Sequence, residues 1–281
     1  MKTSTKLTKT AAILAMAAIG FTSCKKTVTG KKLDGEWDVV SGLIESEYSY
    51  QSGNSTYTTT TTQEFDGSEL ETTTVTNYNG TTSTTITTDQ MSISYTFDRK
   101  AGTYVMTRIA NEEYIDDYGS YYTYDANTNS YQYTGYYERT VMRTSTTTES
   151  GFFTITGDAG EEIEKYSQIV FQPNMMVVDY TDEYSYEDAS TGATLSPNST
   201  YEQGAYNPNT GEYAYNKVPA SASGTESYEG RSYLGTIWNV TELDKDMMMV
   251  EYTDDTIYEN SEDDDANYTQ TTHASWTLNR K

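Results

Sequence analysis

Cysteine, histidine, proline and basic residues are all scarce in this sequence. Its 281 residues include one cysteine, one histidine and four prolines, and 18 basic residues stand against 42 acidic ones. A single cysteine and a single histidine exclude an intrachain disulfide, a Cys/His zinc site and a CxxC redox pair. The net charge of −24 excludes a nucleic-acid binder, because contact with a phosphate backbone requires a basic face.

Aliphatic residues are scarce as well. Leucine, isoleucine, valine and phenylalanine supply 34 of the 258 residues after position 23, which at this charge is a composition typical of disorder. The chain is rich instead in tyrosine (28 residues) and threonine (50 residues), and both favour β-strands. Two interpretations follow: a disordered acidic stalk, or a β domain whose core is built from Tyr, Met and Val.

The N-terminus has the pattern of an export signal. Three lysines in the first nine residues precede an apolar stretch at 11–21, which is too short to span a bilayer. The segment Phe21-Thr22-Ser23-Cys24 follows and resembles the lipobox of bacterial lipoproteins, in which the cysteine becomes the acylated N-terminus. The resemblance implies a signal peptide over 1–23, lipidation of Cys24 and a membrane as partner. The alternative is an ordinary secretory signal with an incidental cysteine.

The charges that follow Cys24 indicate on which side of the outer membrane the anchored protein lies. Four lysines and no acidic residue lie between Cys24 and Asp34, so 24–32 forms a basic tether that can contact anionic head groups. Some surface-exported lipoproteins carry acidic residues directly after the cysteine. Their absence here predicts a protein anchored in the outer membrane and facing the periplasm, with a mature net charge of −27.

The rest of the chain predicts antiparallel β structure. Met91, Ile93, Tyr95 and Phe97 alternate with Ser and Thr, which is a period of two. Four segments begin with Asp or Asn and end four residues later with Gly or Asn, a pattern typical of a side-chain-capped turn that closes at positive φ. These segments are 98–102, 125–129, 188–192 and 207–211.

Two further patterns concern the middle of the chain. Segments 175–182 and 247–254 match at six of eight positions, and each predicts a strand that turns Met and Val inward before an acidic loop. Segments 48–63 and 181–227 are rich in Ser, Thr, Tyr and Gly and poor in aliphatic residues. They predict either long projecting hairpins or mobile loops.

Several segments resemble strands of lipocalin-like domains, in the order of that family. They are 33–40 with Gly35 and Trp37, the hairpin 95–104, the strand 151–157, the strand pair 238–250 and the end 276–281. The resemblance implies an all-β, antiparallel lipocalin-like barrel over 33–281, or an open barrel or sandwich, with long hairpin insertions. It also implies that Gly35, Trp37 and Arg280 close one end, with Arg280 over the Trp37 ring. The alternative is that Trp37 is an ordinary core residue of a sandwich.

No group of catalytic residues stands out. His273 and Ser275 fall on one face of a predicted strand without a third partner, and no local pattern selects a pair of carboxylates. Segment 125–129 begins like a calcium loop but lacks the glycine and the glutamate that such a loop requires, which favours a hairpin turn. We therefore expect no enzyme activity, no cofactor and no metal site.

Two functional hypotheses remain, and a third, a hydrolase, has no residues to support it. The first is a binding module for a small apolar or amphipathic ligand, with Tyr95, Phe97, Met106 and Phe153 as its pocket wall. The second is a structural or interaction protein with a closed core, whose acidic Tyr- and Thr-rich loops contact a protein or a glycan. Tyrosines between 118 and 137 either stack on sugars, line an apolar ligand pocket or pack as cross-strand pairs. We expect the binding module.

Overall fold

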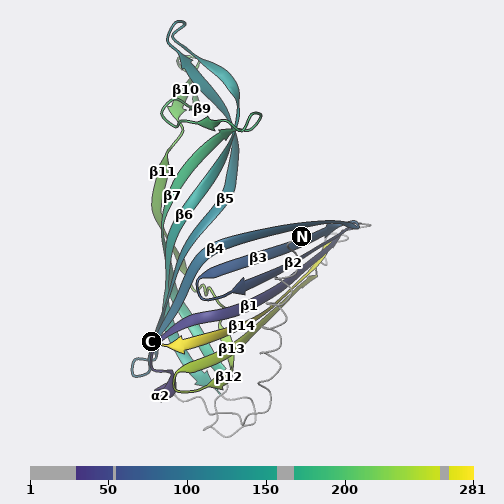
Figure 1. Ribbon diagram of the computed structural model, residues 1–281, viewed down its shortest axis with the longest axis vertical. Helices are drawn as coiled ribbons and strands as arrows, with labels where there is room; N and C mark the ends of the chain where they lie inside the picture. Colours follow the sequence, from purple (N-terminus) through teal and green to yellow (C-terminus); the bar gives the residue numbers. More distant parts are fainter. Residues whose placement is uncertain (1–29, 53–54, 157–167, 260–265) are drawn as a thin grey trace, which may run out of the picture.

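Antiparallel strands dominate the structure, a computed structural model that describes residues 30–52, 55–156, 168–259 and 266–281 (Figure 1). The proposed signal peptide, Cys24 and most of the tether lie outside the described residues. A four-residue helix, α2 (Gly30–Leu33), precedes the first strand. No helix within the described ranges is long and apolar enough to cross a membrane. The prediction of an all-β, antiparallel fold is confirmed.

The strands belong to one continuous sheet. Their bounds in chain order are β1 (Gly35–Ser52), β2 (Ser55–Phe65), β3 (Glu69–Tyr78), β4 (Thr81–Asp98), β5 (Thr103–Asp125), β6 (Ser130–Thr156), β7 (Gln168–Asp188), β8 (Thr194–Leu195), β9 (Tyr201–Asn207), β10 (Glu212–Lys217), β11 (Ser221–Glu229), β12 (Ile237–Leu243), β13 (Met247–Glu259) and β14 (Ala266–Arg280).

Eight strands of the described chain close into a ring. Its order is β1, β4, β5, β6, β7, β12, β13 and β14, and β14 pairs with β1 to complete it. Neighbours in the ring follow one another along the chain, which is the connectivity of an up-and-down barrel. The hairpin of β2 and β3 is inserted between β1 and β4, and β8 to β11 are inserted between β7 and β12.

The ring is not a regular barrel, because its long strands diverge into two arms above a shared base (Figure 1). One arm contains β5, β6 and β7 with β9, β10 and β11, and the other contains β1 to β4 with β13 and β14. The short strand β12 stays at the base. The described residues of the two Tyr- and Thr-rich segments, 48–63 and 181–227, therefore lie mostly in paired strands of the arms.

The base of the ring is filled with aromatic and sulphur-containing side chains. Trp37, Trp238 and Met106 are fully buried there. The Tyr95 ring stacks on Phe97 at 5.8 Å between centroids. Large aromatic rings thus provide much of the buried apolar surface in a chain that has little leucine and isoleucine.

A second, smaller core lies in the arm of β5 to β7. It consists of Tyr121, Tyr137, Tyr186 and Val218. The hydroxyl of Tyr121 donates to Asp188 Oδ2 at 2.7 Å. Burial, and then this hydrogen bond, raise the pKa of Tyr121 to about 12, so the phenol remains a donor at neutral pH.

All four predicted turns are present. In each, the side chain of the first residue accepts a backbone N–H two positions later, from Lys100, Asn127, Ser190 and Asn209 respectively. The last residue of each has positive φ: Gly102 (67°), Asn129 (50°), Gly192 (68°) and Gly211 (73°). The Asp or Asn cap and the left-handed closing residue together make these turns readable from sequence.

The repeated segments 175–182 and 247–254 both form strands, but only the second turns its apolar residues fully inward. Met248 and Val250 of β13 are buried, whereas Met176 and Val178 of β7 are half-buried. The expectation of two inward-facing strands was wrong for β7, because by these residues β7 has left the base and pairs with β11 in the arm.

Candidate functional site

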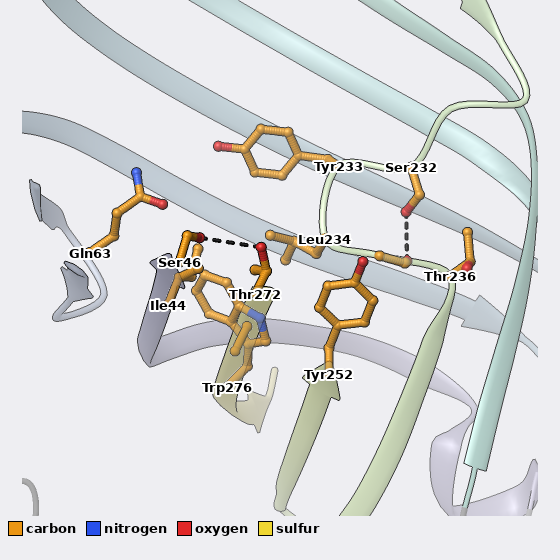
Figure 2. Close-up of a pocket in the computed structure, with 12 residues that line it drawn as sticks. Ile44, Ser46, Gln63, Ser232, Tyr233, Leu234, Thr236, Tyr252, Thr272 and Trp276 are labelled. Carbon is orange, nitrogen blue, oxygen red and sulfur yellow. Dashed lines mark hydrogen bonds between the residues drawn. The ribbon is translucent and has the colours of Figure 1, made fainter. Parts of the chain in front are cut away.

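A pocket lies beside the core, between one arm and the segment 230–236 that joins β11 to β12 (Figure 2). Its volume is about 450 Å³, within the usual range for small-molecule sites. Residues 232–236 form one wall. The opposite wall contains Ile44 and Ser46 of β1, Gln63 of β2, Tyr252 of β13, and Thr272, Ala274 and Trp276 of β14.

The strand wall follows from the period-two alternation of β1 and β14. Ile44 pairs with Ala274 and Ser46 with Thr272, so these four side chains share one face. The next pair toward the base is Gly42 with Trp276. A Cβ on Gly42 would lie 2.1 Å from Trp276 Cε3, so the absence of a side chain at position 42 lets the indole lie against β1.

The pocket carries no formal charge, although the chain as a whole has a net charge of −24. The described residues that line it are apolar or carry hydroxyl and amide groups. Ser46 Oγ and Thr272 Oγ1 lie 3.3 Å apart, and Gln63 Nε2 donates to Thr72 Oγ1 at 3.3 Å. This lining suits a neutral molecule with both apolar and polar parts.

A buried carboxyl group fixes the 230–236 wall to the ring. Glu149 of β6 is 1% exposed. Its Oε2 accepts from the Tyr233 backbone N–H at 2.6 Å, and its Oε1 accepts from the Tyr104 hydroxyl at 2.6 Å. Ser232 Oγ lies 3.3 Å from Oε1. Burial and the bond to Glu149 raise the pKa of Tyr104 far above its usual value, so its hydroxyl remains a donor.

The Tyr233 side chain adds a second attachment for this wall. The Arg108 guanidinium lies over its ring, with Cζ 4.9 Å from the centroid. Arg108 is on β5, which belongs to the other arm from β1 and β14. The segment therefore spans the space between the arms and closes one side of the pocket.

The three residues predicted to close the ring lie together at its base. Arg280 Cζ is 4.7 Å from the centre of the Trp37 ring, and its Nη1 and Nη2 donate to the carbonyls of Asp34 and Lys32. Gly35 has a φ of 119°, and a Cβ there would lie 3.4 Å from Arg280 Nη1. The guanidinium thus covers the indole and joins the last strand to the residues before the first.

The Trp238 indole donates to the backbone carbonyl four residues earlier, as the Trp37 indole does, and this second case was not predicted. Trp238 Nε1 donates to the carbonyl of Leu234 at 3.0 Å, as Trp37 Nε1 does to Leu33 at 2.8 Å. In each case a glycine with positive φ lies between the two residues, Gly35 or Gly235. A leucine four residues before a tryptophan, with an intervening glycine, was the sequence signal for both.

The four residues predicted as pocket wall lie in the packed base. Tyr95, Phe97, Met106 and Phe153 all belong to the buried core, and Phe97 contacts Phe153 at 5.3 Å between centroids. None of the four lines the pocket beside segment 230–236. The alternation of residues in β4 predicted which face of the strand is buried. It could not show whether that face packs against other side chains or borders a pocket.

The remaining candidates are placed as follows. His273 is exposed on β14, with Nδ1 3.3 Å from Thr253 Oγ1. Segment 125–129 is a hairpin turn. In the parts of the chain that the structure describes, no group of three or more His, Cys, Asp or Glu residues is placed to hold a metal ion. Tyrosines between 118 and 137 pair across strands, as Tyr124 does with Tyr131.

Comparison with known proteins identifies no family. No protein-family model matches the sequence, and no curated protein matches it. One similar solved structure is a TodX deltaS2S3 mutant, a monoaromatic hydrocarbon channel, with 8% identity over 88% of this chain and 90% of that one and a TM-score of 0.22. A TM-score this low supports no conclusion, so the description of the fold rests on the strand pairings themselves.

Proposed function

We propose that this chain is a lipid-anchored protein of the cell envelope whose lipocalin-like domain binds a small apolar or amphipathic ligand without catalysis. The observation that carries the proposal is the uncharged pocket of about 450 Å³ between segment 230–236 and the arm of β1 and β14. The up-and-down order of the eight-stranded ring and the Arg280–Trp37 contact support the lipocalin-like part of the proposal.

The chemistry of the pocket supports binding rather than catalysis. Hydroxyl and amide groups orient a ligand, but the lining residues within the described ranges include no carboxyl, imidazole or amine group. Partial burial raises the pKa of the Tyr233 phenol, one of the lining groups. A phenol that holds its proton more tightly is a poor general base at neutral pH.

Binding can be tested with Nile red, an uncharged dye that fluoresces in apolar surroundings. We expect the purified chain to bind the dye and Ser46→Trp to weaken binding at least about tenfold, because an indole at position 46 would occupy the space between the walls. Glu45→Trp is the matched control, since residue 45 is exposed on the opposite face of β1. It should change the Kd by less than about twofold, as measured by fluorescence titration.

Absence of dye binding, or equal weakening by both variants, would contradict the pocket and favour the alternative function. That alternative is an interaction protein, and exposed aromatic side chains favour it. Six tyrosines of the β5–β7 arm and its β9–β10 hairpin are at least 45% exposed: Tyr118, Tyr124, Tyr133, Tyr136, Tyr206 and Tyr213.

The anchor has a separate test. We expect the wild-type chain to pellet with outer membranes and to resist a high-salt wash, because burial of several acyl chains gives stable attachment. Cys24→Ala should move it to the soluble fraction. Lys25→Ala/Lys26→Ala is the control, which should stay in the pellet because two charges contribute far less than the acyl chains. A Cys24→Ala protein that still pellets would contradict the anchor.

A further inference from the structure

The three tryptophans of the chain differ in what their indole N–H groups bind. Trp37 and Trp238 each donate to the backbone carbonyl four residues earlier. Trp276 Nε1 is buried and has no hydrogen-bond partner. All three side chains are at most 2% exposed. An unpaired buried donor is uncommon in folded proteins and requires an explanation; among the described residues, Thr59 Oγ1 and Arg280 Nε are also buried without a partner, but neither residue lines the pocket.

The unpaired donor belongs to the pocket. Trp276 lines the pocket wall, and the edge of its indole that carries Cε3 packs on Gly42. The nitrogen is on the other edge of the ring, and Figure 2 draws it on the side toward Tyr252. The edge with the free donor therefore points away from β1 and toward other lining residues.

The neighbouring polar groups of the wall already interact with one another. The Ser46 and Thr272 hydroxyls lie within hydrogen-bond distance of each other, and Ser232 Oγ donates to the Gly235 carbonyl at 2.7 Å. A ligand that carries an acceptor atom would provide Trp276 with the partner that the protein does not.

We infer that Trp276 is the specificity-determining residue of the pocket, and that its ligand is an uncharged molecule with a hydrogen-bond acceptor such as a ketone, ester or ether oxygen. This inference rests on the proposed binding function. An indole N–H can only donate, so the ligand must accept. An anionic acceptor is disfavoured because no basic residue lines the pocket and the net charge of the chain is −24.

Fluorenone and fluorene provide a matched pair of probes, since they share a flat three-ring skeleton and differ by a ketone oxygen. Equilibrium dialysis of the purified chain should give a Kd for fluorenone about fivefold lower than for fluorene, the factor that one net hydrogen bond supplies. Trp276→Phe keeps an aromatic ring and removes the donor. It should abolish the preference, so that the Kd values of the variant for fluorenone and fluorene agree within about twofold.

The indole proton itself provides a second measurement. Resonance assignment of the wild-type chain identifies the indole signal of Trp276 in its ¹⁵N–¹H spectrum. Saturation with fluorenone should shift this signal downfield more than fluorene does, whereas the Trp37 signal should not distinguish the two probes. This spectrum decides the question on the wild-type chain even if Trp276→Phe fails to fold.

The outcomes separate the inference from the proposed function. If the wild-type chain binds both probes equally, or if Trp276→Phe retains the preference for fluorenone, the inference is overturned while the binding function stands. If neither these probes nor Nile red bind, the proposed function itself fails. Trp37→Phe is the control, because its indole lies at the base and is already hydrogen-bonded, and it should keep the fivefold preference.

Discussion

Replacing Trp238 with alanine is expected to lower the free energy of unfolding by about 4 kcal/mol, the usual loss for a large aromatic residue removed from a core. Trp238 is fully buried and contacts Tyr95 and Phe171 edge-on, with centroids 4.9 and 4.8 Å apart. The change would leave a cavity between these rings and remove the hydrogen bond to Leu234. Urea unfolding followed by circular dichroism measures the effect.

Ile237 provides the control for this prediction. It precedes Trp238 on β12, and its side chain is 45% exposed, so Ile237→Ala should change stability by no more than about 0.5 kcal/mol. A Trp238→Ala protein that unfolds at the same urea concentration as Ile237→Ala would contradict the view that indole burial holds the base together.

Replacing Glu149 with alanine is expected to cost about 3 kcal/mol, because it leaves the buried Tyr104 hydroxyl and the partly buried Tyr233 N–H without an acceptor. The change should also release segment 230–236 from β6. Arg231 is exposed in that segment, so trypsin should cleave after it much faster in Glu149→Ala than in the wild type. Mass spectrometry of the early fragments identifies the cut.

Two other substitutions calibrate the Glu149 result. Glu149→Gln keeps one oxygen for the Tyr233 N–H, and the Tyr104 hydroxyl can accept from its amide, so a loss of about 1 kcal/mol is expected. Thr148→Ala alters the adjacent exposed residue and should be nearly neutral. If Glu149→Ala and Glu149→Gln are equally stable and equally resistant to trypsin, Glu149 does not hold the pocket wall.

The features that sequence reasoning predicted correctly are local ones. Alternation along 91–97 gave a strand with one buried face, and a capping Asp or Asn before a Gly or Asn gave each of the four turns. These signals arise within a few residues, where backbone geometry and side-chain caps act directly. The all-β class followed from them together with the abundance of Tyr and Thr.

The pocket could not be predicted in the same way, because it depends on residues far apart in the chain. Glu149 is preceded by three threonines, and in that setting it looks like one of many solvated acids. Its burial depends on Tyr233, 84 residues later. Likewise, only the pairing of β1 with β14 places Trp276 beside Gly42. Such contacts leave no periodic pattern in the sequence.

The closed base also determines how the molecule would stand on a membrane. The start of β1 and the end of β14 meet there, since the Lys281 N–H donates to the Glu36 carbonyl at 3.0 Å. Gly30 is six residues along the chain from Cys24, a reach of at most about 21 Å for an extended chain. An acyl anchor on Cys24 would therefore hold the base close to the head groups, while the divergent strands extend the tyrosine-rich tip away from the bilayer.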